Sequence, residues 1–119
     1  MHRLLAHTAD LRAELEAPDF NALCAEAVAL VREILVGESP VLPRVERRVM
    51  LEGEEEGERF FRFVRELVYL FDAESFVPAA ARLEGDDAVV SGERFDPLRH
   101  VFERQIKALA TNIAAAYGA

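Results

Sequence analysis

The chain has 119 residues, of which 51% are hydrophobic and 30% charged, and its formal net charge is −8. Its length suits a single domain over residues 1–119, and its composition excludes a disordered chain. An acidic domain is poorly suited to holding nucleic-acid phosphates by itself, so no strong direct nucleic-acid binding is expected.

The sequence also argues against a membrane segment and against a disulfide bond. No apolar run reaches the roughly 18 residues that a membrane span needs. The apolar start is interrupted by His7 and Asp10, too early for a signal peptide, so we expect a cytoplasmic protein with no membrane partner. Cys24 is the only cysteine, which excludes an intrachain disulfide and predicts a small buried hydrophobe. The acidity suits solubility, docking on a basic partner or carboxylate binding of a cation, and these alternatives stay open.

The first half of the chain predicts a strand, a helix and a second strand. Apolar and charged residues alternate over residues 11–17, which indicates a half-buried strand. Asp19 suits the N-cap of a helix over residues 20–36, and Gly37 suits its end. The apolar face of this helix is wide, so we expect it to be mostly covered. Residues 45–52 alternate again and predict a strand.

The second half predicts a helix and a hairpin. Acidic residues 53–58 form an expected solvated loop that places negative charge at the start of a helix over residues 60–72. This helix carries an aromatic core stripe with further apolar residues beside it, so we expect more than one covered side. Residues 82–91 predict a hairpin, and residues 92–97 a loop. Residues 102–117 fit either a helix or a strand, and propensity favours the helix. The pattern predicts an α+β domain with two helices packed on a mixed or antiparallel sheet.

Three polar stretches are candidate functional sites. One precedes the first strand, one lies at residues 92–100, and one is a single lysine near the end of the chain. The alternative for the first two stretches is a turn whose side chains satisfy backbone donors. The chain has no glycine-rich phosphate loop, no nucleophile elbow and no histidine pair at helical spacing, so an enzyme is not expected. The candidate residues are His7, Asp10, Glu93, Asp96, His100 and Lys107.

Taken together, these stretches resemble the archease family. The resemblance rests on HTAD at residues 7–10, ELVYLFD at residues 66–72 and a closing block at residues 92–108 that contains GE, FDP, His100 and IKA. It spans nearly the whole chain in the family's order. It implies a mixed sheet with two helices, in which the chain from Ile106 onward is a strand. It also implies a non-catalytic accessory protein that promotes guanylylation and multiple turnover of a tRNA-splicing or RNA-repair ligase, its expected partner.

The resemblance further implies a metal site. Asp10 matches the family's metal-site aspartate and Lys107 its functional lysine, so we expect these two residues to meet in a negatively biased pocket. The family's closing Phe-Asp-Ile strand, which completes the metal site, has no counterpart before Ala119. Binding of a divalent cation, Ca²⁺ or Mg²⁺, is therefore expected to be weak or absent. We expect the same difference to leave a strand edge exposed, which makes a homo-oligomer an alternative to a monomer.

Two other functions stay open. A metal-free binding or chaperone-like module would keep the fold without the metal site. A small metal-assisted hydrolase ranks last, because a catalytic metal usually has about three protein ligands plus an open position.

Overall fold

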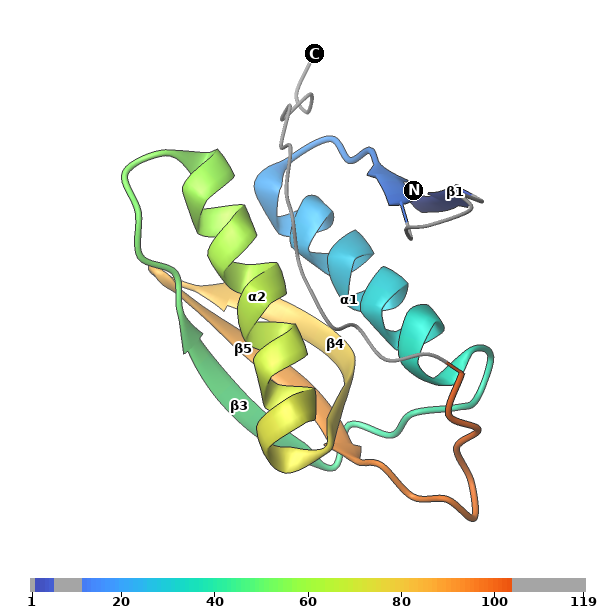
Figure 1. The fold of residues 1–119 in the computed structure, drawn as a ribbon. Helices are drawn as coiled ribbons and strands as arrows, with labels where there is room; N and C mark the ends of the chain where they lie inside the picture. Colours follow the sequence, from blue (N-terminus) through green and yellow to red (C-terminus); the bar gives the residue numbers. More distant parts are fainter. Residues whose placement is uncertain (1, 6–11, 104–119) are drawn as a thin grey trace.

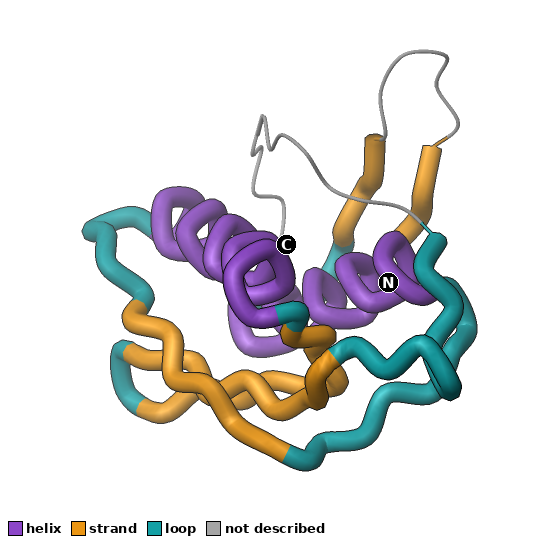
Figure 2. Tube along the Cα trace, turned by 60° about the horizontal axis from the view of Figure 1, so that its bottom comes forward, coloured by secondary structure: helices purple, strands orange, loops and turns teal. Residues whose placement is uncertain are grey.

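The computed structural model of the protein describes residues 2–5 and 12–103. In chain order its elements are β1 (His2–Leu5), β2 (Arg12–Leu15), α1 (Phe20–Val36), β3 (Val45–Met50), α2 (Glu56–Glu74), β4 (Phe76–Glu84) and β5 (Asp87–Arg94). Strands β3, β5 and β4 form an antiparallel sheet in that order, and β1 pairs with β2 in a separate antiparallel hairpin beside α1 (Figure 1). Figure 2 shows the two helices as one layer lying on the three-stranded sheet. The predicted α+β fold is confirmed, and both sheets within the described part of the chain are antiparallel.

Helix α1 has the bounds that its sequence predicts. The carboxylate of Asp19 accepts a hydrogen bond from the backbone N–H of Ala22 at 2.7 Å, and Gly37 ends the helix with a φ of +58°. The helix is mostly covered, as expected, with Cys24 among its buried residues. Burial raises the pKa of the Cys24 thiol to about 12, and the nearby Arg59 opposes this only in part. Cys24 is therefore an unreactive core residue.

Helix α2 is longer than its apolar pattern predicts. It begins within the acidic segment, where Glu56 and Glu58 lie in the first turn. Their negative charges stabilise the helix by interacting with the positive end of its dipole. It ends at Ser75, which adopts a left-handed φ of 57° and donates its N–H to the last-turn carbonyls. Of the residues expected to widen the covered face, Phe61 and Val68 are half-buried, whereas Tyr69 is 60% exposed, so the expectation is met only in part. The core stripe consists of Phe60, Phe63, Leu67 and Leu70.

The predicted hairpin is confirmed, but its strands extend further than the sequence indicates. Residues 92–94, expected in a loop, are the end of β5, where they pair with β4 and β3. Gly92 makes this possible. A Cβ atom there would lie 2.1 Å from the carbonyl oxygen of Val77, so only glycine allows β4 and β5 to approach so closely beside a bulge in β4.

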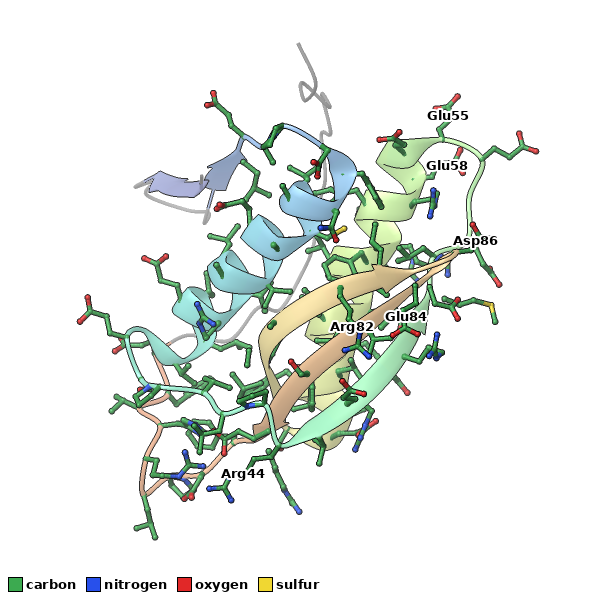
Figure 3. All side chains as sticks on the ribbon, turned by 180° about the vertical axis from the view of Figure 1, so that it is seen from behind. Arg44, Glu55, Glu58, Arg82, Glu84 and Asp86 are labelled. Atoms are coloured by element: carbon green, nitrogen blue, oxygen red, sulfur yellow. The ribbon has the colours of Figure 1, made fainter. Side chains whose placement is uncertain are left out.

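The sheet face away from the helices carries a network of ion pairs. Arg48 contacts Asp87 at 3.2 Å and Glu84 at 3.1 Å, while Arg82 contacts Glu46 and Glu84, each at 2.8 Å. Figure 3 shows Arg82 and Glu84 on this face. These five residues are termed the open-face network. The two arginines and three carboxylates thus pair with one another at the solvent-facing surface.

Two further findings bear on the predictions. Of the stretch at residues 102–117, only residues 102 and 103 are described, and they lie in irregular structure, so the choice between helix and strand is outside the described residues. Neither described helix combines the length and apolar character needed to cross a bilayer.

Candidate functional site

The candidate stretch at residues 92–100 folds around a buried carboxylate at the end of β5. Glu93 and His100 are each 3% exposed, and they are the buried polar residues of the described chain. Asp96 and Arg99 lie beside them in the turn that follows β5. These four residues are termed the Glu93 cluster. A buried carboxylate is costly unless cations and donors surround it, so the contacts of Glu93 determine what this site can do.

Donors from three directions surround Glu93. Arg99 binds its two oxygens with both terminal nitrogens, the Nη1 contact measuring 3.1 Å. The backbone N–H of Leu42 donates to Oε2 at 2.6 Å. The hydrogen bonds from Arg99, with help from the Leu42 N–H, lower the pKa of Glu93 to about 2, although burial acts in the opposite direction. Glu93 is therefore a fixed anion that holds the structure together, not a proton donor at neutral pH.

His100 completes the cluster in its neutral form. The backbone N–H of Asp96 donates to Nδ1 at 2.8 Å, so Nδ1 carries a lone pair and the ring proton lies on Nε2. Nε2 lies 3.3 Å from Oε2 of Glu93 and donates to it. The ring thus links the start of the turn to the end of β5. The side chain of His100 has no exposed surface, which leaves it no access to a solvent-borne substrate.

Asp96 sets the turn itself. Its carboxylate accepts from the backbone N–H of Leu98 at 2.9 Å, and its carbonyl accepts from the backbone N–H groups of Arg99 at 3.0 Å and His100 at 2.7 Å. Asp96 also contacts Nε of Arg99 at 3.3 Å. The turn predicted at this position is confirmed, and it aims Arg99 at Glu93.

The cluster ties two distant segments together. Leu42 lies in the connection between α1 and β3, and so does Ser39, whose hydroxyl accepts from the N–H of Val101 at 3.0 Å. Further along, the N–H of Glu103 donates to the carbonyl of Leu35 near the end of α1 at 2.8 Å. The end of β5 and Val101 are therefore hydrogen-bonded to the α1–β3 connection, and Glu103 to the end of α1.

Aromatic rings pack beneath this segment. The ring of Phe95 lies 5.6 Å from His100 and meets Phe71 of α2 edge-on at 6.5 Å. Phe102 stacks on Phe71 at 6.1 Å. These contacts fasten the segment to α2 by apolar packing. Its outer side remains open, and Leu98 is 93% exposed at the tip of the turn.

An open hollow of about 800 Å³ lies beside the cluster, at the end of the sheet where β3 begins and β5 ends. Figure 3 shows Arg44 at this end, while Asp86 lies at the opposite end of the sheet. The residues lining the hollow include Arg44, Arg47, Arg94 and Arg99, together with Glu74, Glu93 and Asp96.

The structure brings three of the predicted site residues together, namely Glu93, Asp96 and His100. His7, Asp10 and Lys107 lie outside the described residues, so the expected meeting of Asp10 and Lys107 stays a prediction. Sequence reasoning missed Arg99, although its place between Asp96 and His100 is a signal that could have found it. It also missed Leu42 and Ser39, which no local pattern connects to this turn.

The described residues do not supply a metal site. No group of three or more His, Cys, Asp or Glu side chains within residues 2–5 and 12–103 is placed to hold an ion. The Glu93 cluster does not fit a cation either, because hydrogen-bond donors and a guanidinium already occupy the oxygens of Glu93. The prediction for Asp10 concerns residues outside this range.

Comparison with known proteins gives a consistent assignment. The model of the archease protein family matches residues 2–114. The protein archease of Sulfurisphaera tokodaii is 25% identical over 109 residues, covering 87% of this chain and 78% of the relative. The protein archease of Archaeoglobus fulgidus is 30% identical over 95 residues, covering 77% of this chain and 69% of the relative. The family match includes the whole Glu93 cluster as well as both helices and every strand of the sheet. On this evidence the chain belongs to the archease family.

Proposed function

We propose that this protein is a non-catalytic accessory factor that promotes guanylylation and multiple turnover of a tRNA-splicing or RNA-repair ligase. Membership of the archease family supports the proposal. The observation that carries it is the construction of the segment at residues 95–103. This segment is anchored from beneath by the Glu93 cluster while its tip, Leu98, is almost fully exposed.

The chemistry of the cluster suits support rather than reaction. Glu93 is a fixed anion and His100 is enclosed, so neither presents a reactive group to solvent. No buried side-chain polar atom among the described residues lacks a hydrogen-bond partner, which means that the cluster needs no ligand to complete it. Its effect is to hold the turn in one conformation.

A rigid turn with an exposed leucine is well suited to docking. An apolar side chain that enters a pocket on a partner gains from leaving water, and a preordered turn loses little conformational entropy on binding. Val101 and Phe102, which are 64% and 50% exposed, extend the apolar surface along the same segment. We propose that this surface contacts the ligase.

The first test is a guanylylation assay with the cognate ligase, nucleotide and metal. The wild-type protein should raise the yield of ligase–guanylate and the number of turnovers. Leu98→Ala should reduce the stimulation about tenfold at subsaturating concentration, the expected size for a central apolar contact. Met50→Ala is the matched control, because Met50 is also exposed, at 65%, but lies at the far end of β3. Equal stimulation by all three proteins would exclude docking through this turn.

The second test concerns the metal. We propose that Asp10 and Lys107 serve the accessory role, and that any binding of Ca²⁺ or Mg²⁺ at Asp10 is weak. Calorimetric titration of the wild type and Asp10→Ala with Ca²⁺, Mg²⁺ and Mn²⁺ measures this directly. Loss of stimulation in Asp10→Ala supports the role of Asp10. Stimulation that survives in Asp10→Ala would favour the metal-free binding module instead.

A further inference from the structure

The residues that line the hollow at the end of the sheet include more arginines than carboxylates, whereas the whole chain has more acidic than basic residues. The whole chain has 22 acidic residues against 14 lysines and arginines. The lining of the hollow has four arginines against three carboxylates. An arginine-rich lining at one end of an acidic domain is a local feature that overall solubility does not explain.

Two of the four arginines are already engaged. Arg47 contacts Glu74 at 2.9 Å and lies over the ring of Phe76, and Arg99 is held by Glu93 and Asp96. These pairs account for all three carboxylates of the lining. Because Arg99 faces two carboxylates, these contacts leave one negative charge, and with Arg44 and Arg94 the lining has a net charge of +1.

Arg44 lies beside the Glu93 cluster but does not hydrogen-bond to it. Its Nε lies 3.7 Å from Oε1 of Glu93, beyond hydrogen-bond distance, and its side chain is 63% exposed. Its backbone is nevertheless fixed, because its N–H donates to the carbonyl of Gly92 at 2.9 Å. Arg44 therefore forms an ion pair with Glu93 but no hydrogen bond to it, because Arg99 and other donors occupy Glu93, and its exposed guanidinium can still donate hydrogen bonds to another anion.

Arg94 is the second exposed arginine of the lining. It is exposed at the end of β5, its backbone pairs with Phe76, and it forms no ion pair with another described residue. The open-face network is the reverse case, since both Arg48 and Arg82 contact carboxylates there. Among the described arginines of the three-stranded sheet and its ends, Arg94 has no ion pair with a described residue, and Arg44 has only the 3.7 Å pair with Glu93.

We propose that this hollow binds a phosphate group of a small ligand, with Arg44 and Arg94 as the direct contacts. Guanidinium groups match phosphate oxygens in geometry as well as in charge. The rest of the lining adds apolar surface from Val45, Phe95 and Pro97, and the hollow is open to solvent. The net charge of −8 disfavours a long polyanion and favours a compact ligand that carries its charge at one end. The phosphate belongs either to a free nucleotide or to the end of a short nucleic acid.

Calorimetric titration of the full-length protein at low ionic strength tests this proposal. The probes are inorganic pyrophosphate, ADP, and a short single-stranded RNA with either a 3′-phosphate or a 3′-hydroxyl end. Pyrophosphate should bind the wild type, and Arg44→Gln/Arg94→Gln should weaken it by about tenfold or more, since two charge-assisted contacts are lost. Tighter binding of ADP than of pyrophosphate identifies a free nucleotide as the source. Preference for the 3′-phosphate RNA over its 3′-hydroxyl form identifies a nucleic-acid end.

The matched control is Arg48→Gln/Arg82→Gln, which removes the same total charge from the open-face network. It should leave pyrophosphate binding unchanged. Equal weakening by both double variants, or no binding of any probe by the wild type, would overturn the proposal. So would equally tight binding of a short polyglutamate peptide, because it would indicate a general anionic surface. Phosphate binding and ligase stimulation are separate readouts, and either can fail without the other.

Discussion

The Glu93 cluster and the open-face network use the same side chains in opposite surroundings. Both contain carboxylates and an arginine that contacts two of them, but the open-face network lies on the three-stranded sheet, whereas the cluster joins Glu93 of β5 to the turn that follows. In the open-face network the arginines and Glu84 are substantially exposed. In the cluster, Glu93 is enclosed together with a neutral histidine ring and a backbone N–H.

The difference shows why one group matters more for stability than the other. Solvent and salt screen the exposed pairs, and their side chains lose entropy when they are held in place. Glu93 has no water to replace a lost partner, so each contact is needed to offset its burial. The pKa of Glu84 in the open-face network and the pKa of Glu93 both lie below the ordinary value, chiefly because arginines donate hydrogen bonds to them. Only the shift of Glu93 is large.

The largest expected effect is that of replacing Glu93 by glutamine, and the same replacement in the open-face network is its control. Glu93→Gln should lower the free energy of unfolding by about 3 kcal/mol, because it leaves Arg99 and the cluster donors without their anion. Glu84→Gln is the matched control on the open face. Urea unfolding at pH 7 measures both. A loss for Glu93→Gln no greater than that of Glu84→Gln would contradict the distinction between the regions.

Acid titration sharpens the comparison through a single group. The pKa of Glu93 falls from an ordinary value of 4.5 to about 2 in the folded protein. Its stabilising contribution is therefore complete above pH 4.5 and is lost as the pH falls toward 2. The difference in unfolding free energy between the wild type and Glu93→Gln should shrink over that window. A difference that stays constant from pH 7 to pH 2.5 would contradict the assignment.

His100→Ala should have the next largest effect. The substitution removes a buried ring and leaves the N–H of Asp96 without its acceptor, at an expected cost of about 2 kcal/mol. Hydrogen exchange should show faster exchange of the Asp96 and Val101 amides, because the segment loses its anchor. Unchanged protection of both amides would mean that the aromatic packing alone holds the turn.

The smallest effect is expected for Arg82→Ala in the open-face network. Little or no change in unfolding free energy should appear, and raising the salt concentration should remove what there is. Thermal unfolding at low and high salt measures it. A large loss that persists in high salt would show that the network acts as more than a set of screened surface pairs.

Several elements were predictable because local chemistry decides them. Asp19 and Gly37 define both ends of α1, and the apolar spacing between them defines its covered face. By contrast, residues 92–94 look like a turn in sequence because Gly92 and two charged residues break the strand pattern. Only pairing with β4 makes them a strand and encloses Glu93.

In the candidate site, too, part of the structure follows from local sequence and part depends on distant residues. The spacing of Glu93, Asp96 and His100 suggested a polar turn, and the turn forms through contacts within seven residues along the chain. Its burial depends on Leu42, which is 51 residues from Glu93. The hydrogen bonds within a turn can be predicted from sequence, because their donors and acceptors are close together along the chain. Whether a carboxylate in that turn becomes an enclosed anion or a solvated one depends on which distant backbone packs against it, and only the tertiary structure decides that.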